Sequence, residues 1–131
     1  MATGLYSTND TGWVTPELTS AFTTYDSNSV VRYRRCGDVV NISGQITPTE
    51  TITASSNVYV IFNLPSNCAP KQMIAFVCQG SNQYLWECIV FNDGTVGFYR
   101  YRRGTSASDC PAGAWLSFGC SFIVGGWAWS A

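Results

Sequence analysis

The chain of 131 residues contains no histidine, and this absence removes the most common catalytic groups. Histidine is the usual base for serine and cysteine nucleophiles, and it is a principal zinc ligand. No nucleotide-binding or serine-hydrolase motif is present. A glycosidase needs two carboxylates about 5 to 10 Å apart, but Glu87 is the only acidic residue within an expected strand. We therefore predict no catalytic residues, no metal and no cofactor, and we expect a protein that is not an enzyme.

Charged residues are also scarce, at 11% of the chain, and the net charge is −1. A nucleic-acid-binding domain needs a strongly basic face, so the composition argues against a nucleic-acid partner. Disordered chains combine high charge with few aromatics, whereas aromatic residues here reach 15%. No apolar run approaches the roughly 18 residues of a membrane span, and the first residues lack a secretory signal. We expect a folded domain without membrane insertion.

Cysteines number six, and an even count permits three disulfides in a secreted chain. No Cys-x-x-Cys pair occurs, and several cysteines interrupt or follow apolar stretches, where a free thiol behaves as a small buried hydrophobe. Buried thiols are therefore favoured over disulfides, and disulfides over metal binding, for Cys36, Cys68, Cys78, Cys88, Cys110 and Cys120.

The apolar residues predict β-strands, because they alternate or gather in short blocks between turn-forming residues. The alternation is clearest at 39–47, where Val40, Ile42 and Ile46 share one face. We predict an all-β fold, an antiparallel β-barrel or small β-sandwich of about seven or eight strands without a substantial helix. The expected strands are 22–25, 30–35, 39–47, 58–64, 73–78, 84–91, 95–102 and 115–124, with a short edge strand at 51–53.

Further expectations concern domain limits and burial. The length suits one domain, and the polar opening predicts a flexible lead at 1–12 before a single β domain at 13–131.

The strand at 73–78 is almost wholly apolar, which predicts that it is covered on both faces. In the strand at 58–64, alternation would turn Val58, Val60, Phe62 and Leu64 inward.

All six arginines lie in two Arg-Tyr-Arg-Arg tetrads, at 32–35 and 100–103. Alternation along the second strand would place Arg100 and Arg102 on one face and the tyrosines on the other. Three interpretations remain open. The tetrads form a solvated face whose arginine stems cover apolar surface, a subunit interface, or a site for an anionic glycan. In the last case arginine binds the charge and tyrosine the sugar face.

Aromatic residues supply two further candidates. Tyr84 and Trp86 share a strand face, so their rings form a candidate platform. Trp127 and Trp129 also share strand parity. We favour packing of this aromatic tail on its own domain, with contact to a partner or to a ligand as the alternatives. Both residues are candidate interface residues. The candidate ligand-binding residues are Tyr84, Trp86, Tyr99, Arg100, Tyr101 and Arg102.

Three ordered stretches carry a family resemblance within residues 13–122. The first is Trp13-x-Thr15-Pro16-x-Leu18, followed by Phe22 and Tyr25. The second is Val31-Arg32-Tyr33-Arg34-Arg35-x-Gly37-Asp38-x-Val40-x-Ile42-x-Gly44, and the third is Phe62-x-Leu64-Pro65 with Pro70, followed by Trp115-Leu116-Ser117-Phe118-x-Cys120-Ser121-Phe122. Together they resemble the C-terminal head domains of tail-fibre and baseplate proteins in phages of Gram-positive bacteria, and the second is the most telling.

The resemblance implies an antiparallel β-barrel or sandwich at the tip of a longer, usually trimeric fibre that contacts host cell-wall saccharide. Such a protein is made in the bacterial cytoplasm and ends in the virion, at the tail tip. The shared motif marks scaffold and not receptor contacts, so no binding residue is carried over from it. We expect the chain to be the tip of a longer fibre protein.

The expected function is therefore that of a non-enzymatic receptor-binding head, a homotrimer in its context, that attaches to a host cell-surface glycan. One alternative is a structural baseplate or fibre-tip domain without receptor contact. Another is a secreted carbohydrate-binding module.

Overall fold

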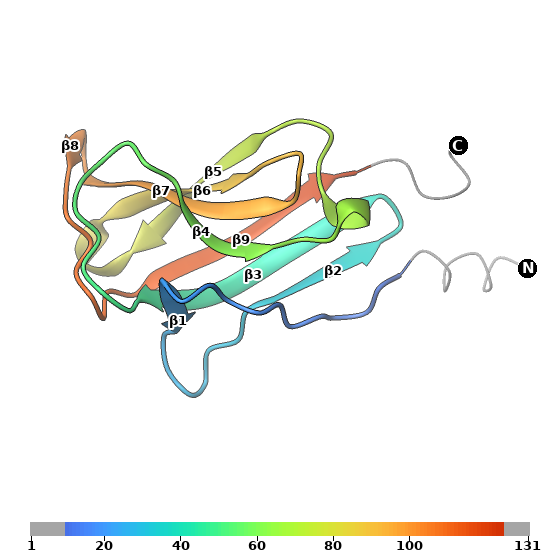
Figure 1. The fold of residues 1–131 in the computed structure, drawn as a ribbon, viewed down its shortest axis with the longest axis horizontal. Coiled ribbons are helices and arrows are strands. Elements are labelled where there is room, and N and C mark those ends of the chain that lie inside the picture. Colours follow the sequence, from blue (N-terminus) through green and yellow to red (C-terminus); the bar gives the residue numbers. More distant parts are fainter. Residues whose placement is uncertain (1–9, 125–131) are drawn as a thin grey trace, which may run out of the picture.

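The computed structural model describes residues 10–124, which form one curled antiparallel sheet with the shape of a half-barrel (Figure 1). The all-β prediction is confirmed. Among these residues the only helical elements are two short 3-10 turns, η1 (Ser66–Cys68) and η2 (Ser81–Gln83). The strands are β1 (Phe22–Thr24), β2 (Arg32–Cys36), β3 (Val39–Pro48), β4 (Tyr59–Asn63), β5 (Ile74–Gly80), β6 (Leu85–Val90), β7 (Thr95–Arg103), β8 (Ser106–Ala107) and β9 (Leu116–Ile123).

The described part of the chain contains no helix with the length and apolar character needed to span a membrane.

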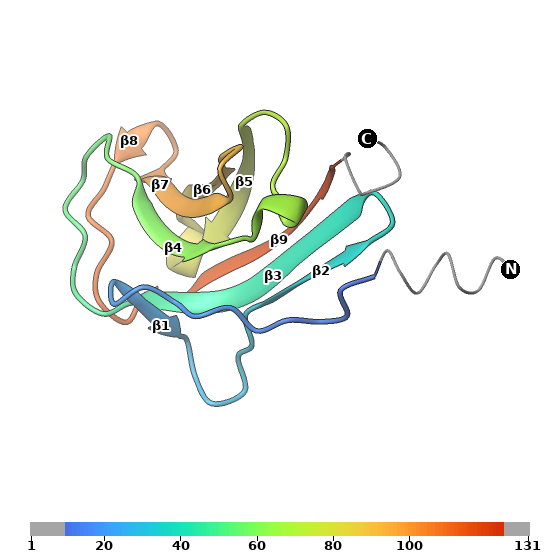
Figure 2. The same ribbon diagram turned by 45° about the vertical axis from the view of Figure 1, so that its right-hand side comes forward.

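The strand order is β1-β3-β9-β5-β6-β7-β4, with β2 also paired to β3 and β8 to β7. β2, β3 and β9 run side by side along the length of the molecule, and β4 to β7 curl back over them (Figure 2). β3 pairs with β9 over eight residues, from Val39–Ile123 to Ile46–Leu116. The curl encloses one face of the sheet, and that face holds the core.

The core is made by inward-facing residues of the curled strands. Val40, Ile42 and Ile46 of β3 are buried, as the alternation predicted. Aromatic rings fill the space between the two sides of the curl, and the Trp86 ring lies edge-on to Phe118 with centroids 6.0 Å apart. Such ring pairs add directional stabilisation to the burial of apolar surface.

An N-terminal segment, residues 10–19, bridges the two edges of the curled sheet. Val14 and Tyr33 of β2 exchange backbone hydrogen bonds of 2.8 and 2.9 Å. Further along, the backbone amide of Thr19 donates to the carbonyl of Ile61 in β4 at 2.9 Å. Because β2 and β4 lie at opposite edges of the sheet, this segment covers the opening that the half-barrel leaves between them.

The start of this segment is anchored to β2. Asp10 accepts hydrogen bonds from both Nε, at 2.9 Å, and Nη2 of Arg34, and the Thr11 amide donates to the Arg35 carbonyl at 2.9 Å. Residues 10–12 of the lead predicted at 1–12 are thus hydrogen-bonded to β2. The remainder of that lead, 1–9, lies outside the described residues, as does the end of the predicted domain, 125–131.

Two strands depart from the predicted burial. β5 is not covered on both faces, because residues 10–124 form a single sheet and none of them makes a second layer outside it, and Val77 is 66% exposed. In β4 the pairing with β7 shifts between Val60 and Phe62, so strict alternation from Val58 fails. Ile61 and Phe62 are both fully buried as a result. β8 lies where the sequence predicts a loop.

All six cysteines are free, and all six lie within the described residues. Five are buried, which confirms the prediction of buried thiols, and Cys36 is exposed.

Arg35 does not belong to a solvated arginine face, because its side chain is fully buried. Its guanidinium donates to the carbonyl of Gly37 at 2.8 Å and to the carbonyl of Asn67 in η1, and it lies 3.5 Å from a carboxylate oxygen of Asp38. Burial lowers the pKa of Arg35 from its ordinary value. This arginine ties the β2–β3 turn to η1, so the Arg-Tyr-Arg-Arg-x-Gly-Asp stretch serves as scaffold here.

Candidate functional site

A β-bulge in β7 shapes the surface that carries most of the candidate residues. The β6–β7 ladder pairs Glu87 with Tyr99 and then shifts, so that Arg100 and Tyr101 together lie opposite Trp86. Arg100 has a φ of 56°, in the left-handed region that non-glycine residues seldom adopt. A bulge of this kind reorients the side chains that follow it.

The bulge places Phe98 and Tyr101 on the same inner face, where they are 2% and 6% exposed. Tyr99 and Arg102 lie on the other, outer face and are half-buried. The prediction that Tyr99 and Tyr101 share a face is therefore wrong, because the extra residue reverses the alternation beyond it. Arg100, at the bulge itself, is exposed.

Two arginines gather around one carboxylate on the outer face. Arg102 Nη1 donates to Glu87 Oε2 at 3.1 Å, and Arg100 Nε lies 3.8 Å from the same oxygen. The Arg102 side chain is 20% exposed, whereas that of Arg100 is 58% exposed. The Arg100 guanidinium also lies 5.7 Å from the ring centre of Tyr99. One carboxylate thus faces two guanidinium groups, which leaves a local excess of positive charge.

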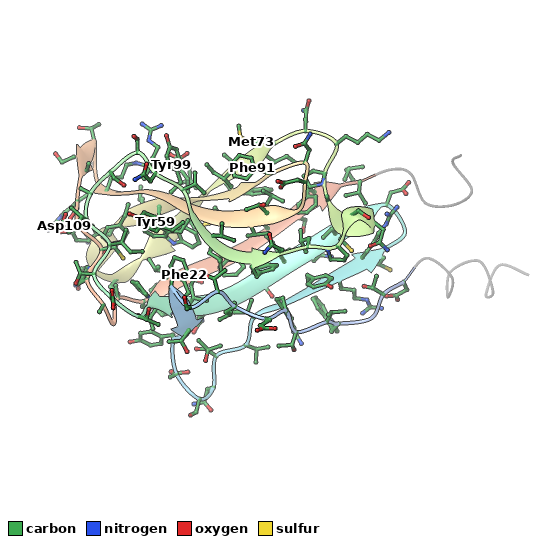
Figure 3. All side chains as sticks on the ribbon, in the orientation of Figure 1. Phe22, Tyr59, Met73, Phe91, Tyr99 and Asp109 are labelled. Atoms are coloured by element: carbon green, nitrogen blue, oxygen red, sulfur yellow. The ribbon has the colours of Figure 1, made fainter. Side chains whose placement is uncertain are left out.

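A groove of about 530 Å³ runs beside these side chains. One wall is β7 with the turn into β8, and the other is the loop before β4. In Figure 3, Tyr99 and Asp109 lie toward the same end of the molecule. The groove is lined by Ala54, Ser55, Ser56, Tyr99, Arg100, Tyr101, Arg102, Thr105 and Ala107.

The loop that forms the second wall is held in place by the segment before β9. Ile52 and Cys110 exchange two backbone hydrogen bonds of 2.8 Å each, where the sequence predicted an edge strand at 51–53. The Ala54 amide donates to Asp109 Oδ1 at 2.8 Å. These contacts fix the loop from which Ser55 and Ser56 line the groove.

Of the other predicted residues, Trp86 is not available to a ligand. Its side chain is fully buried, and its Nε1 donates to the carbonyl of Gln79 at 3.2 Å. Its ring packs on Phe98, with centroids 5.5 Å apart. The predicted Tyr84–Trp86 surface platform is therefore wrong, since Trp86 belongs to the core.

Tyr84 lies on the far side of Tyr101 from the groove. The two rings stack with centroids 4.9 Å apart and planes 7° from parallel, and the guanidinium of Arg103 lies 5.8 Å from the Tyr84 ring centre. Burial raises the pKa of Tyr101 to about 12. Tyr84 edges a separate hollow of about 520 Å³ with Pro111 and Ala112, so it does not share the groove of Tyr99.

The first arginine tetrad lies apart from the groove and contacts Trp13. The Arg32 guanidinium lies 4.2 Å from the Trp13 ring centre and that of Arg34 lies 5.8 Å from it. Trp13 is 48% exposed. This aromatic–arginine cluster was not predicted, since nothing in the local sequence shows that the N-terminal segment pairs with β2.

Among residues 10–124 there is no group of three or more potential metal ligands. Trp127 and Trp129, the predicted interface residues, lie outside the described part of the chain.

A scan against protein-family models finds no match, and a search of curated proteins finds no similar protein.

Proposed function

We propose that the chain is the receptor-binding head of a phage tail fibre, and that the groove beside β7 binds a host-surface glycan without converting it chemically. The observation that carries the proposal is that Tyr99, Arg100 and Arg102 line one side of a groove whose other side is lined by Ser55 and Ser56. The sequence resemblance to tail-fibre head domains supports the same reading.

The groove offers the groups that sugars and their substituents require. A half-exposed tyrosine ring such as Tyr99 presents an apolar face for a pyranose ring with a polar edge beside it. The hydroxyls of Ser55, Ser56 and Thr105 exchange hydrogen bonds with sugar hydroxyls. Arg100 is the more exposed guanidinium and binds phosphate or carboxylate. A glycan bearing an anionic substituent therefore fits the groove best.

A shallow groove on one chain binds weakly, and several copies compensate. In a homotrimer at the virion tail tip, three grooves act on one cell surface, and binding of the first raises the effective concentration for the others. This arrangement supports attachment even where a single groove exchanges its glycan quickly.

The two alternatives predict different observations. A structural baseplate domain has no reason to bind cells. The free state of all six cysteines disfavours a secreted module stabilised by disulfides.

The test measures binding of the purified chain to Gram-positive cells and to their isolated cell-wall polysaccharide, with its solution mass determined in parallel. We expect binding that Tyr99→Ala and Arg100→Ala each reduce by about tenfold or more, as is usual for central aromatic and arginine contacts. Arg32→Ala, an arginine on the other tetrad, is the matched control and leaves binding unchanged. Absence of binding by an intact trimer at high concentration would overturn the proposal in favour of the structural role.

A further inference from the structure

The hollow of about 520 Å³ beside Tyr84 is a second candidate site, next to the groove at Tyr99. One wall is the η2 turn between β5 and β6, and it includes Asn82. The other wall is the segment between β8 and β9, and it includes Asp109. Because the side chain of Tyr101 lines both the groove and the hollow, the two are direct neighbours.

Hydrogen bonds hold the two walls of the hollow in place. The Trp115 amide donates to Ser81 Oγ at 2.8 Å, and the Ser81 amide donates to the Trp115 carbonyl at 2.9 Å, so the η2 turn is joined to the start of β9. The segment before β9 is fixed by the backbone pairing of Cys110 with Ile52. A ligand therefore meets walls that are already ordered, and binding loses little free energy to their ordering.

The η2 turn keeps an unusual backbone conformation. Asn82 and Gln83 follow each other with φ values of 56° and 67°, in the left-handed region that non-glycine residues seldom adopt. The Gly80 amide closes the turn by donating to the Tyr84 carbonyl at 2.8 Å. Asn82 lines the hollow, whereas Gln83 does not. Strained backbone that the surrounding structure maintains is concentrated at ligand sites, and here it lies in the wall of a hollow.

An aromatic ring and a proline give the hollow an apolar surface. Tyr84 is fixed by its parallel stacking on Tyr101, with ring centroids 4.9 Å apart. It is only half-buried, so part of it stays accessible at the hollow. Pro111 adds apolar surface from the other wall. Rigid apolar surface beside polar groups suits a sugar ring, which has C–H groups as well as hydroxyls.

The charges at the hollow select an uncharged ligand. Asp109 is the only charged residue that lines it in the part of the chain that the structure describes, and no ion pair within that part holds its carboxylate. This carboxylate disfavours an anionic ligand. The Arg103 guanidinium, 5.8 Å from the Tyr84 ring centre, disfavours a cationic one. A carboxylate and the Asn82 amide are groups that exchange hydrogen bonds with hydroxyls.

We propose that the hollow binds an uncharged sugar unit of the host glycan. Asp109 accepts hydrogen bonds from the sugar hydroxyls, Asn82 bonds to the same unit through its amide, and Tyr84 contacts the C–H groups. This second site rests on the proposed function, because it holds another unit of the glycan whose anionic substituent binds in the groove. The ligand class is then a polysaccharide that contains both anionic and uncharged sugar units.

The test is an NMR titration of the full, isotope-labelled chain with a neutral polysaccharide. The probe is Gram-positive cell-wall polysaccharide whose phosphates have been cleaved and whose carboxylates have been reduced to alcohols. We expect saturable shifts of the Asn82, Ala112 and Gly113 amides, all in the walls of the hollow.

Two variants of one turn separate the amide from the backbone. Asn82→Gly removes the side-chain amide and keeps the left-handed backbone, and we expect it to weaken binding of the neutral polysaccharide by about threefold or more. Gln83→Gly is the matched control, because it relieves the same conformation one residue away from the hollow, and it leaves the affinity unchanged.

Asp109→Asn tests the carboxylate. The variant keeps an oxygen for the Ala54 amide, which donates to Asp109 Oδ1 at 2.8 Å, but replaces the other oxygen by a donor. We expect it to weaken binding by about tenfold, as loss of a hydrogen bond to a charged group usually does. Unchanged affinity in both Asn82→Gly and Asp109→Asn overturns the proposal, and so does equal weakening by Gln83→Gly and Asn82→Gly.

A parallel titration with the intact polysaccharide separates this site from the proposed function. Intact polysaccharide that binds, and that Arg100→Ala weakens, while the hollow does not respond to the neutral form, overturns the second site alone. A response at the hollow, with binding of the intact form unaffected by Arg100→Ala, supports the second site and overturns the groove. Absence of binding by either form overturns both.

Discussion

The Glu87 carboxylate accepts a hydrogen bond from Arg102 at 3.1 Å, directly beside the β7 bulge that carries Arg100. Glu87 is therefore the counter-charge of the candidate groove. It holds Arg102 in place and at the same time competes with any anionic ligand for the two guanidinium groups.

Glu87→Gln is expected to strengthen binding of an anionic cell-wall polysaccharide several-fold at low salt, because it releases two arginines from a negative partner while keeping a hydrogen-bond acceptor. The loss of folding stability is about 1 kcal/mol or less, as for other partly exposed ion pairs. Titration calorimetry at two salt concentrations measures the gain, which salt diminishes. Glu17→Gln, an exposed acid elsewhere, is the control. Weaker binding by Glu87→Gln would contradict this assignment.

Arg100 offers a matched pair of substitutions at one backbone position. Arg100→Gly and Arg100→Ala remove the same guanidinium, but only glycine accepts the φ of 56° without strain. We expect the glycine variant to be more stable than the alanine variant by about 1 kcal/mol, from urea unfolding. Both variants lose polysaccharide binding equally. An alanine variant as stable as the glycine variant would show that the bulge carries no strain.

The bulge also marks the limit of what the sequence predicts. Regular alternation in β3 is visible because Val40 and Ile42 are apolar and their neighbours polar, and the structure confirms it. Nothing in the sequence around Arg100 shows an extra residue, because bulges are commonly recognised by glycine and here the position is arginine. The faces of Tyr99 and Tyr101 therefore depended on tertiary packing against Trp86.

Arg35 was more accessible to sequence reasoning. It has the same parity as Val31 and Tyr33, both buried, so alternation alone places it on the inner face. The residue type predicted a solvent-exposed side chain instead, because a buried guanidinium needs several hydrogen-bond acceptors. Those acceptors are backbone carbonyls of Gly37 and of Asn67, and the second lies far along the chain.

Gly44 lies where strands pack too closely for a side chain. A Cβ at this position would lie 2.7 Å from Cγ2 of Val31 and 3.0 Å from the Phe118 ring. We expect Gly44→Ala to reduce the free energy of unfolding by about 1 to 3 kcal/mol, as overpacking usually does. Gly119→Ala is the control, since a Cβ there meets nothing within 4 Å. Thermal unfolding distinguishes the two, and equal melting temperatures would contradict the packing described for β3.

Asp10 gives the anchoring of the N-terminal segment a defined pH dependence. Hydrogen bonds from Arg34, and a further one from the Gly12 amide, lower the pKa of Asp10 from 3.8 to about 2. A carboxyl whose pKa is lower in the folded state stabilises that state fully above its unfolded pKa, and the stabilisation is lost as pH falls through the folded pKa. The anchor therefore weakens between about pH 4 and pH 2.

Asp10→Asn is expected to remove the pH dependence of that step. Hydrogen exchange of the Thr11 and Val14 amides, measured across the same pH range, reports whether the N-terminal segment stays bound to β2. Identical pH profiles for the variant and the wild type would refute a role for the Asp10–Arg34 pair in holding the segment.

The cysteines are expected to separate into one reactive thiol and five protected ones. Cys36 is exposed, whereas burial raises the pKa of Cys110 to about 12 and keeps it in the unreactive thiol form. A colorimetric thiol reagent should titrate one thiol per native chain, and all six after denaturation without reductant. Fewer than six in the denatured protein would indicate a disulfide and revive the secreted-module alternative.

Both ends of the described chain meet at the β2–β3 turn, where Asp10 pairs with Cys36 and the Val124 amide reaches Asp38. The groove at Tyr99 lies toward the opposite end of the molecule, and the long strands run between the two (Figure 3). A pull between a tethered ligand and the chain ends would act along these strands. The ladder hydrogen bonds of β3 and β9 would then be loaded together in shear instead of being unzipped one at a time. Under the proposed attachment role, we expect a ladder loaded in shear to resist force better than one that is opened from its end.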